Sequence, residues 1–250
     1  MKFSRFIIND KIKYGIVERN LIRVISGDLY GDWEYTSEEY SVDQVKLLTP
    51  IIPNQIIGIG RNYVTNIDEK PSVLPEIPVF FMKPTSSIIG PNDDIFLPKT
   101  IDKVKFESEL AVIIGKEAKN IAEDEVLHYI FGYTVSNDVT APQFFHEDGH
   151  WMVGKSFDTF TPLGPYVVTD INPFKVKVKA RVNNIEKQNS GTDLMIFSIN
   201  KMVSYLSEVM TLKQGDIILT GSPVGAELVI TGDIVECEIE EIGKLNNRVF

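Results

Sequence analysis

The sequence predicts an α+β fold that is rich in strands, with a mixed or antiparallel sheet and a small N-terminal domain. Three observations favour this class. Short apolar runs bounded by turn residues recur along the chain, only one long segment has clear helical spacing, and no internal repeat is evident. The 250 residues, of which 43% are hydrophobic and 24% charged, suffice for a large core in one domain or in two unequal ones.

The first 50 residues are expected to form a small unit. Strand-like runs at 15–17 and 21–25 are separated by turn residues, and 41–48 has the apolar spacing of a short helix. Pro50 and Pro53 then interrupt the chain, so we expect a boundary near residue 54 and domains at 1–54 and 55–250.

The second domain is expected to be mostly strands. They are predicted at 55–60, 79–82, 105–114, 131–139, 165–169, 176–182, 216–220 and 234–239. Helices are predicted over 122–129, with Asn120 as N-cap and Glu123 completing a capping box, and over 193–210, where apolar residues recur at helical spacing.

Charge and cysteine content exclude several function classes. The chain has 35 acidic and 25 basic residues, a net charge of −10 that disfavours nucleic acid and anionic membranes as partners. The single cysteine, Cys237, cannot form an intramolecular disulfide and suits a reducing compartment. No apolar run approaches the ~20 residues of a membrane span or the length of a signal peptide, so we expect a cytoplasmic protein.

Two short motifs point to functions that their surroundings do not support. Gly58-x-Gly60 follows a strand, as in dinucleotide-binding folds, but Tyr63 stands where the third glycine belongs. Residues 146–150 match the H-E-x-x-H pattern of zinc peptidases, but Gly149 interrupts the helix that this pattern needs. A surface loop with two solvated histidines, His146 and His150, is the plainer interpretation.

A pair of carboxylates is a stronger indication of a functional site than these two motifs. Glu107 and Glu109 alternate along an apolar strand, so both side chains point to one face, roughly 7 Å apart. Burying two like charges is costly unless a cation lies between them, and oxygen-only ligands suit Mg²⁺ or Mn²⁺. An edge strand with solvated acids is the alternative.

Two further residues fit such a site. Asp138 ends a second apolar strand and would add a third carboxylate, while Lys155 follows Gly154 before a hydrophobic turn. A lysine there would stabilise negative charge that develops on a metal-bound oxygen. Taken singly, an Asp at this place is more often a turn former and a Lys is more often solvated.

Ordered motifs run through the chain from about residue 55 onward. They are NY at 62–63, PVFFMKP at 78–84, ESELA at 107–111, GYT at 132–134, NDV at 137–139, GKSFDTFTPLGP at 154–165, a Thr at 192 with MIF at 195–197, and GDIILTGSP at 215–223. This series resembles the fumarylacetoacetate hydrolase family.

The resemblance implies a β-rich catalytic domain with a mixed sheet or β-roll, a homodimer, and a small-molecule 2-oxo acid as substrate. Mg²⁺ or Mn²⁺ would be the cofactor, stabilising an enolate at the 2-oxo group. By the same resemblance, Lys155 would contact the chelated end of the substrate. The implied metal ligands are Glu107, Glu109 and Asp138, and the implied substrate-binding residues are Tyr63, Lys83, Thr192 and Thr220.

The chain departs from the family pattern in three places, of which the mildest is Ser222, where the family has a Thr and the hydroxyl is kept. Asn66 stands where hydrolytic members have the His of a His–Glu pair, although Glu69 remains, and an amide cannot take a proton at neutral pH. Pro142 stands where an Arg commonly binds the distal part of the substrate. His146 or His150 could serve as the base instead. Residues 61–75 are expected to close over the substrate as a lid.

Several reactions therefore stay open. Isomerase, tautomerase or decarboxylase chemistry on 2-oxo acids ranks level with hydrolysis of an acylpyruvate, and dehydration of a 2-keto-3-deoxy sugar acid follows. A binding protein on the same scaffold that has lost catalysis is the alternative of a different class.

Overall fold

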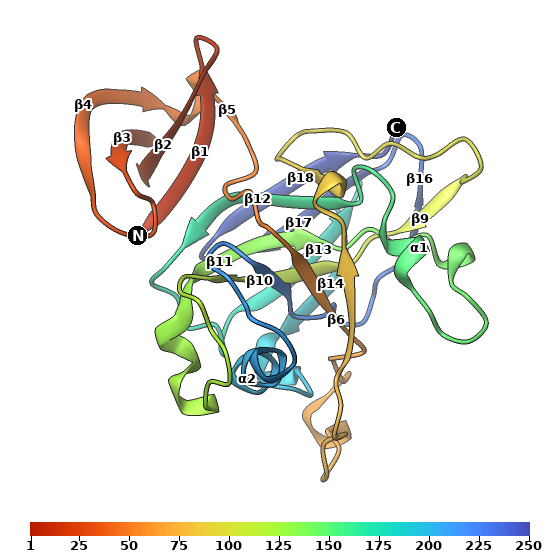
Figure 1. The fold of residues 1–250 in the computed structure, drawn as a ribbon. Coiled ribbons are helices and arrows are strands. Elements are labelled where there is room, and N and C mark those ends of the chain that lie inside the picture. The colour runs from red at the N-terminus through yellow and green to blue at the C-terminus, as the bar shows by residue number, and fades with distance from the viewer.

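The computed structural model describes residues 1–250 and confirms the strand-rich fold, with one long mixed sheet through the molecule (Figure 1). The hydrogen-bonded path through this sheet is β4-β3-β2-β1-β12-β11-β10-β15-β6-β7. Its strands are β1 (Lys2–Ile8), β2 (Lys11–Glu18), β3 (Leu21–Gly27), β4 (Trp33–Ser41), β12 (Thr161–Val168), β11 (Ile130–Asn137), β10 (Ser108–Ile114), β15 (Ile217–Leu219), β6 (Ile56–Gly60) and β7 (Val79–Lys83). β5 (Lys46–Leu47) pairs with β1, and β8 (Ile88–Ile89) with β12.

Two smaller sheets complete the β structure. The four-stranded one has the order β14-β13-β17-β18, and a two-stranded ribbon pairs β16 with β9. Their bounds are β13 (Lys177–Val182), β14 (Ile185–Gly191), β17 (Ile234–Ile239), β18 (Gly243–Arg248), β9 (Lys103–Lys105) and β16 (Leu228–Ile230). The main core lies between β10 and β11 of the long sheet and β13, β17 and β18 of the second. Every residue of β10 is buried as a result.

The first four strands form meandering hairpins that join the long sheet through β1 and pack Phe3, Ile16 and Ile25 against Ile113 and Ile217. β1 pairs antiparallel with β12 at Lys2↔Val168 and Phe3↔Val167. The short helix expected over 41–48 is a single 3₁₀ turn, η1 (Val42–Gln44), with Ser41 and Gln44 forming a capping box. β5 ends before and β6 begins after the expected boundary near residue 54, and that boundary stays a prediction.

The predicted helices are shorter than the apolar spacing indicates, or are 3₁₀ rather than α. α2 (Ile199–Val209) begins only after Ser198, which caps it, because residues 192–194 form a separate 3₁₀ turn, η6 (Thr192–Leu194). Residues 123–129 are 3₁₀ rather than α, as η4 (Glu123–Tyr129), and the predicted capping box is wrong: Asn120 has a left-handed backbone and Ala122 is the N-cap. The remaining short helices are η2 (Ile67–Glu69), η3 (Thr85–Ser87), η5 (Pro142–Phe144) and α1 (Met152–Lys155). None of the helices is long and apolar enough to cross a bilayer.

Asn62 fastens the turn after β6 to two distant segments. Its side chain is fully buried, and the amide donates to the carbonyls of Thr220 (2.8 Å) and Phe197 (3.2 Å), while its carbonyl accepts from the Phe197 N–H (2.7 Å). The three bonds satisfy backbone groups that no water reaches, so they hold the end of β6 beside β15 and the segment before α2.

We expect Asn62→Ala to lower the free energy of unfolding by about 3 kcal/mol, because it leaves several buried backbone groups without a partner. Asn189→Ala is the matched control, since that exposed amide bonds only Glu186, and it should cost less than about 0.5 kcal/mol. Urea denaturation of both variants measures the difference, and equal losses would contradict this role for Asn62.

Candidate active site

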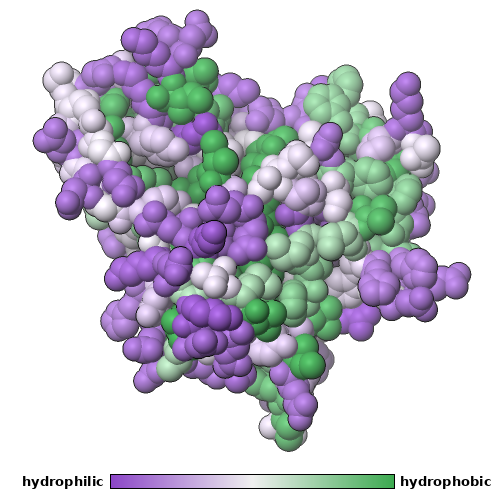
Figure 2. All heavy atoms as spheres, in the orientation of Figure 1, coloured by the Kyte–Doolittle hydropathy of each residue, from purple (hydrophilic) through white to green (hydrophobic).

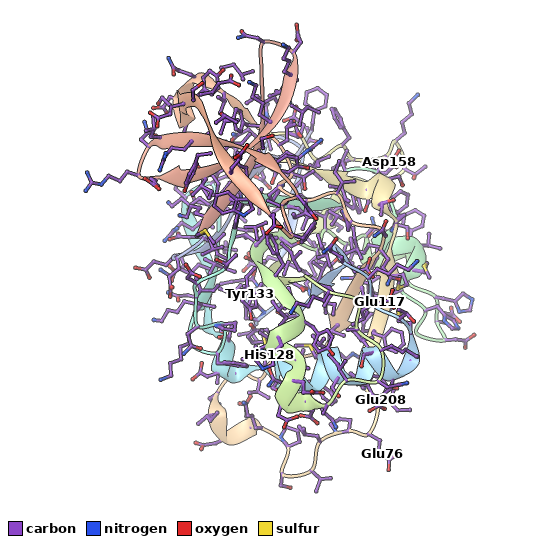
Figure 3. The ribbon with its side chains drawn as sticks, turned by 60° about the vertical axis from the view of Figure 1, so that its left-hand side comes forward. Glu76, Glu117, His128, Tyr133, Asp158 and Glu208 are labelled. Atoms are coloured by element: carbon purple, nitrogen blue, oxygen red, sulfur yellow. The ribbon has the colours of Figure 1, made fainter.

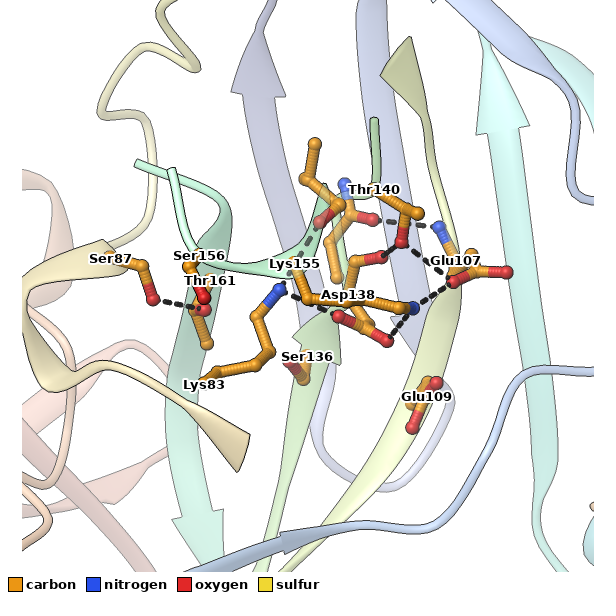
Figure 4. Close-up of polar contacts among 12 residues, drawn as sticks. Lys83, Ser87, Glu107, Glu109, Ser136, Asp138, Thr140, Lys155, Ser156 and Thr161 are labelled. Carbon is orange, nitrogen blue, oxygen red and sulfur yellow. Dashed lines mark hydrogen bonds and ion pairs between the residues drawn. The ribbon is translucent and has the colours of Figure 1, made fainter. Parts of the chain in front are cut away.

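The three acids singled out in the sequence converge where β10 begins and β11 ends. The two strands are antiparallel with Ser108 opposite Asn137, so the residue before β10, Glu107, lies beside the residue after β11, Asp138. The Asp138 N–H donates to the Glu107 carbonyl (2.8 Å), and the Asn137 side chain accepts from the Glu107 N–H (2.9 Å). Strand pairing alone therefore joins acids that are 31 positions apart in the chain (Figure 4).

Two buried lysines neutralise part of this negative charge. The Lys155 ammonium bonds the Glu107 carboxylate (2.6 Å) and also Asp138, and Lys83 donates to Asp138 (2.7 Å) and to the Val139 carbonyl (3.2 Å) (Figure 4). Burial lowers the pKa of Lys83. Burial opposes the charge of Lys155 as well, yet the carboxylates of Asp138 and Glu107 raise its pKa above the ordinary value. Lys155 is therefore a permanent ammonium in this site.

Glu109 has no such partner. Its side chain is 2% exposed and its carboxylate accepts only the Gly221 N–H (2.7 Å). Burial, and next the neighbouring charge of Asp138, raise the pKa of Glu109 well above its usual range. A buried acid that no side-chain cation contacts calls for positive charge from outside the chain.

These acids form one side of a pocket of about 280 Å³. Its charged lining consists of three carboxylates and three cations, and its apolar wall is largely aromatic. The lining residues are Ile59, Gly60, Arg61, Phe81, Lys105, Glu107, Glu109, Asp138, Thr140, Pro142, Phe145, Trp151, Lys155 and Ser222. Two lining residues donate hydrogen bonds to the Glu107 carboxylate, Thr140 at 2.9 Å and Lys105 at 2.9 Å.

The donor set fits a divalent cation, although it is not gathered around one point here. No group of three or more His, Cys, Asp and Glu side chains is arranged to hold a metal ion, because the Lys155 ammonium lies between Glu107 and Asp138 and Glu109 is bonded to Gly221. Three carboxylates are nevertheless the ligands that Mg²⁺ and Mn²⁺ prefer. The buried Glu109 carboxyl group, which no side-chain cation contacts, is the observation that favours a cation at this place.

The predicted substrate-binding residues lie behind the wall of the pocket rather than in its lining. Thr192 donates to the Val176 carbonyl (3.3 Å), and Thr220 to the Leu110 carbonyl (2.9 Å). Lys83 is buried against Asp138. The Tyr63 hydroxyl is buried without a hydrogen-bond partner, and burial followed by the charge of Glu109 raises its pKa. Contact of these four with substrate stays a prediction.

The predicted acid–base residues lie outside the pocket as well. Asn66 and Glu69 occupy a projecting arm, the part of the chain around η2, and bond each other at 2.7 Å while both are exposed. Figure 2 shows polar and apolar residues together at the tip of this arm, and Glu76 marks the tip in Figure 3. His146 is exposed on the loop before α1, where its ring accepts from the Asp148 N–H (3.2 Å). Their catalytic roles, and the lid movement of 61–75, stay predictions.

Sequence reasoning missed the side of the pocket that faces the acids. Phe145 and Trp151 stack with ring centroids 5.7 Å apart, Phe81 meets Trp151 edge-on, and Arg61 lies over the Trp151 ring. A signal was present for Arg61, because it directly follows Gly60 in the turn after a buried strand, where side chains often serve function. The aromatic residues carry no comparable signal, since most aromatics belong to cores.

Family models match nearly the whole chain. Residues 55–250 match the model for the C-terminal domain of fumarylacetoacetate (FAA) hydrolase, and residues 1–50 match one described as Rv2993c-like, N-terminal. A mitochondrial oxaloacetate tautomerase of Xenopus laevis is 40% identical over 222 residues, which are 84% of this chain and 70% of that protein.

Solved structures agree with this assignment. A 5-carboxymethyl-2-hydroxymuconate delta-isomerase from Mycobacterium smegmatis is 38% identical with a TM-score of 0.93, and the match covers 100% of this chain and 99% of that one. A maleylpyruvate hydrolase from Sphingobium sp. SYK-6, in complex with manganese(II) ion and pyruvate, is 29% identical with a TM-score of 0.84 over 100% and 98% of the two chains. The similar proteins thus include a tautomerase, an isomerase and a hydrolase.

We expect Lys155→Met to lower the free energy of unfolding by about 3–5 kcal/mol, because it strips the ammonium from two acids and leaves their charges facing each other. Lys201→Met removes an exposed ammonium from Glu123 (3.0 Å) and should barely change the free energy of unfolding, because water and salt screen this ion pair. Both values come from urea denaturation at neutral pH. Similar small losses for the two variants would show that the Lys155 pairs are not needed to hold the site.

Proposed function

The chain belongs to the fumarylacetoacetate hydrolase family of enzymes, and we propose that it catalyses the keto–enol interconversion of a 2-oxo acid with a divalent cation as cofactor. The observation that carries this proposal is the buried Glu109 carboxylate beside Glu107 and Asp138, in a pocket with no histidine in its lining. The substrate is a small molecule, as the names of the similar enzymes suggest.

We assign Glu107, Glu109 and Asp138 as the residues that would hold Mg²⁺ or Mn²⁺. A cation bound there would polarise the 2-oxo carbonyl and so acidify the neighbouring C3–H bond. Charge balance supports this assignment, since Glu109 lacks a cation partner and a divalent ion could take over the neutralising role that Lys155 has at Glu107 and Asp138.

Lys155 would then act on the substrate. Its ammonium lies at the pocket beside the assigned metal ligands, so it is placed to donate a hydrogen bond to a developing oxyanion. The Phe81 ring, 4.6 Å from the ammonium, limits its movement on the open side of the pocket.

The contents of the pocket favour tautomerisation over hydrolysis. Interconversion moves one proton from C3 to the 2-oxo oxygen and needs no attacking water. C–C hydrolysis needs a water activated by a base, and the Asn66–Glu69 pair lies on the exposed arm, with an amide in the place of the basic member. The sequence similarity to an oxaloacetate tautomerase also favours tautomerisation.

Metal removal and one substitution test the proposal. The wild-type chain should catalyse enol–keto interconversion of oxaloacetate with Mg²⁺ or Mn²⁺ and lose this activity with a chelator. Glu109→Gln should reduce it more than about 100-fold, because changes outside a ligand set already cost 10–100-fold in metal affinity. The thermal shift that Mg²⁺ produces in the wild type should vanish in the same variant. The rate of the reaction is measured from the change in absorbance of the enol.

Glu117→Gln is the matched control, since Glu117 is exposed on the loop after β10, away from the pocket (Figure 3). It should keep both the activity and the thermal shift. Full activity in the presence of chelator, or an unimpaired Glu109→Gln variant, would refute the proposed metal chemistry.

The substitution Asn66→His tests why hydrolysis is disfavoured. With a histidine beside Glu69, hydrolysis of an acylpyruvate should rise, since a positioned acid–base group contributes roughly 10²–10⁴-fold. The thermal shift with Mg²⁺ should not change, because position 66 lies outside the ligand set. If His146→Ala or His150→Ala abolishes hydrolysis in the native chain and Asn66→His adds nothing, the base lies on the other loop.

A further inference from the structure

Arg61 is a pocket-lining cation that the proposed chemistry leaves unused. Two arginines on the strands pair with acids, Arg23 with Glu39 and Arg181 with Glu236 and Glu238. The guanidinium of Arg61 joins no carboxylate and no hydrogen-bond acceptor of the chain, although it lines the same pocket as the three acids. The five N–H donors of this guanidinium thus lie at the lining of the pocket and have no acceptor in the chain.

The backbone holds Arg61 in an uncommon conformation. Its φ is 55°, in the left-handed region that a non-glycine residue adopts only at a cost. At the preceding position a Cβ would lie 2.2 Å from the Trp151 ring, so only glycine lets the indole pack against the turn. Trp151 in turn lies under the guanidinium, with 5.5 Å between the guanidinium carbon and the ring centroid. The turn and the indole together keep the guanidinium at the wall of the pocket.

The charges of the lining indicate what such a guanidinium would bind. The lining has three carboxylates and three cations, and the buried Lys83 pairs with Asp138 from behind, so a divalent ion at the acids would leave this region with an excess of positive charge. A 2-oxo monocarboxylate supplies one negative charge, whereas a 2-oxo dicarboxylate supplies two. Of the other lining cations, Lys155 pairs with Glu107 and Asp138, and Lys105 pairs with Glu107 at 2.9 Å. Arg61 alone has no acid.

We propose that Arg61 determines specificity by binding the second carboxylate of a 2-oxo dicarboxylic acid whose 2-oxo end lies at the three acids. This inference rests on the proposed function for the placement of the 2-oxo end. The planar guanidinium can bond both oxygens of a carboxylate, and the indole beneath it preserves its orientation. Pro142 and Phe145 line the same pocket but carry no charge that could bind a carboxylate.

A matched substrate pair isolates the second carboxylate. Oxaloacetate and 2-oxobutanoate both have four carbons and differ only in a carboxylate or a methyl group at the far end. Exchange of their C3 protons for deuterium, followed by NMR with Mg²⁺ and corrected for the uncatalysed rate, gives kcat/KM for each. We expect Arg61→Gly, which tolerates a positive φ, to lower the ratio of the two values about 10- to 100-fold, mainly through KM of oxaloacetate. Arg61→Lys should retain part of the preference.

Arg19→Gly is the control, because Arg19 is also exposed with a left-handed backbone (φ 59°) but lies in the turn between β2 and β3. It should leave the ratio unchanged. A ratio that Arg61→Gly does not alter, or a preference that Lys105→Met removes and Arg61→Gly keeps, would overturn the assignment to Arg61.

Binding provides a second readout that does not depend on turnover. Calorimetry with 2-oxoglutarate and 2-oxopentanoate, which differ in the same way, should show a preference for the dicarboxylate that Arg61→Gly removes and Arg19→Gly keeps. If the wild type binds with this preference but catalyses no exchange, the proposed reaction fails and the role of Arg61 holds. If neither pair is distinguished by the wild type, the role of Arg61 fails, whatever the reaction.

Discussion

The antiparallel pairing of β10 with β11 is the constraint on which the rest of the site depends. It places Glu107 and Asp138 side by side at the edge of the core, with Glu109 one step further into a strand that is buried along its whole length. Three acids at such a place cannot all be solvated, so cations must come to them. Lys155 and Lys83 meet this requirement at Glu107 and Asp138, whereas no side-chain cation reaches Glu109, whose pKa burial raises.

The lysines let the chain fold around its acids before any other cation arrives. Ion pairs of this kind gain little net stability over an apolar core, but removing one partner is costly. If a divalent ion took the place of Lys155 at Glu107 and Asp138, both acids would have a cation partner with or without the metal, and the strands that carry them could stay paired in both states. The same ammonium can therefore serve the fold in one state and the substrate in the other.

Sequence periodicity could predict the side of the site that is built on strands. Alternation placed Glu107 and Glu109 on one face, and the end of an apolar run marked Asp138, because strand geometry is regular. The side built on loops escaped prediction. Nothing local shows that Arg61 meets Trp151, 90 positions away, or that Thr192 and Thr220 bond carbonyls behind the wall. Residues 123–129 form a 3₁₀ helix although their composition suits an α-helix. Helix propensity does not distinguish an α-helix from a 3₁₀ helix, so the sequence could not predict this difference.

This division between strands and loops has a consequence for specificity. The acids are held by a sheet that tolerates little change, whereas the opposite wall includes exposed and half-buried residues of the turn after β6 and of the loop before α1, where substitutions disturb the core less. In this chain those segments bring a free guanidinium and two aromatic rings to the pocket and leave its lining without a histidine. The loops thus contribute recognition of a charged group, and proton transfer at C3 falls to water, because all three pocket carboxylates are assigned to the cation. Such a weak base suffices for a four-carbon 2-oxo dicarboxylate. In this substrate C3 lies between two carbonyl groups, which already make its protons acidic.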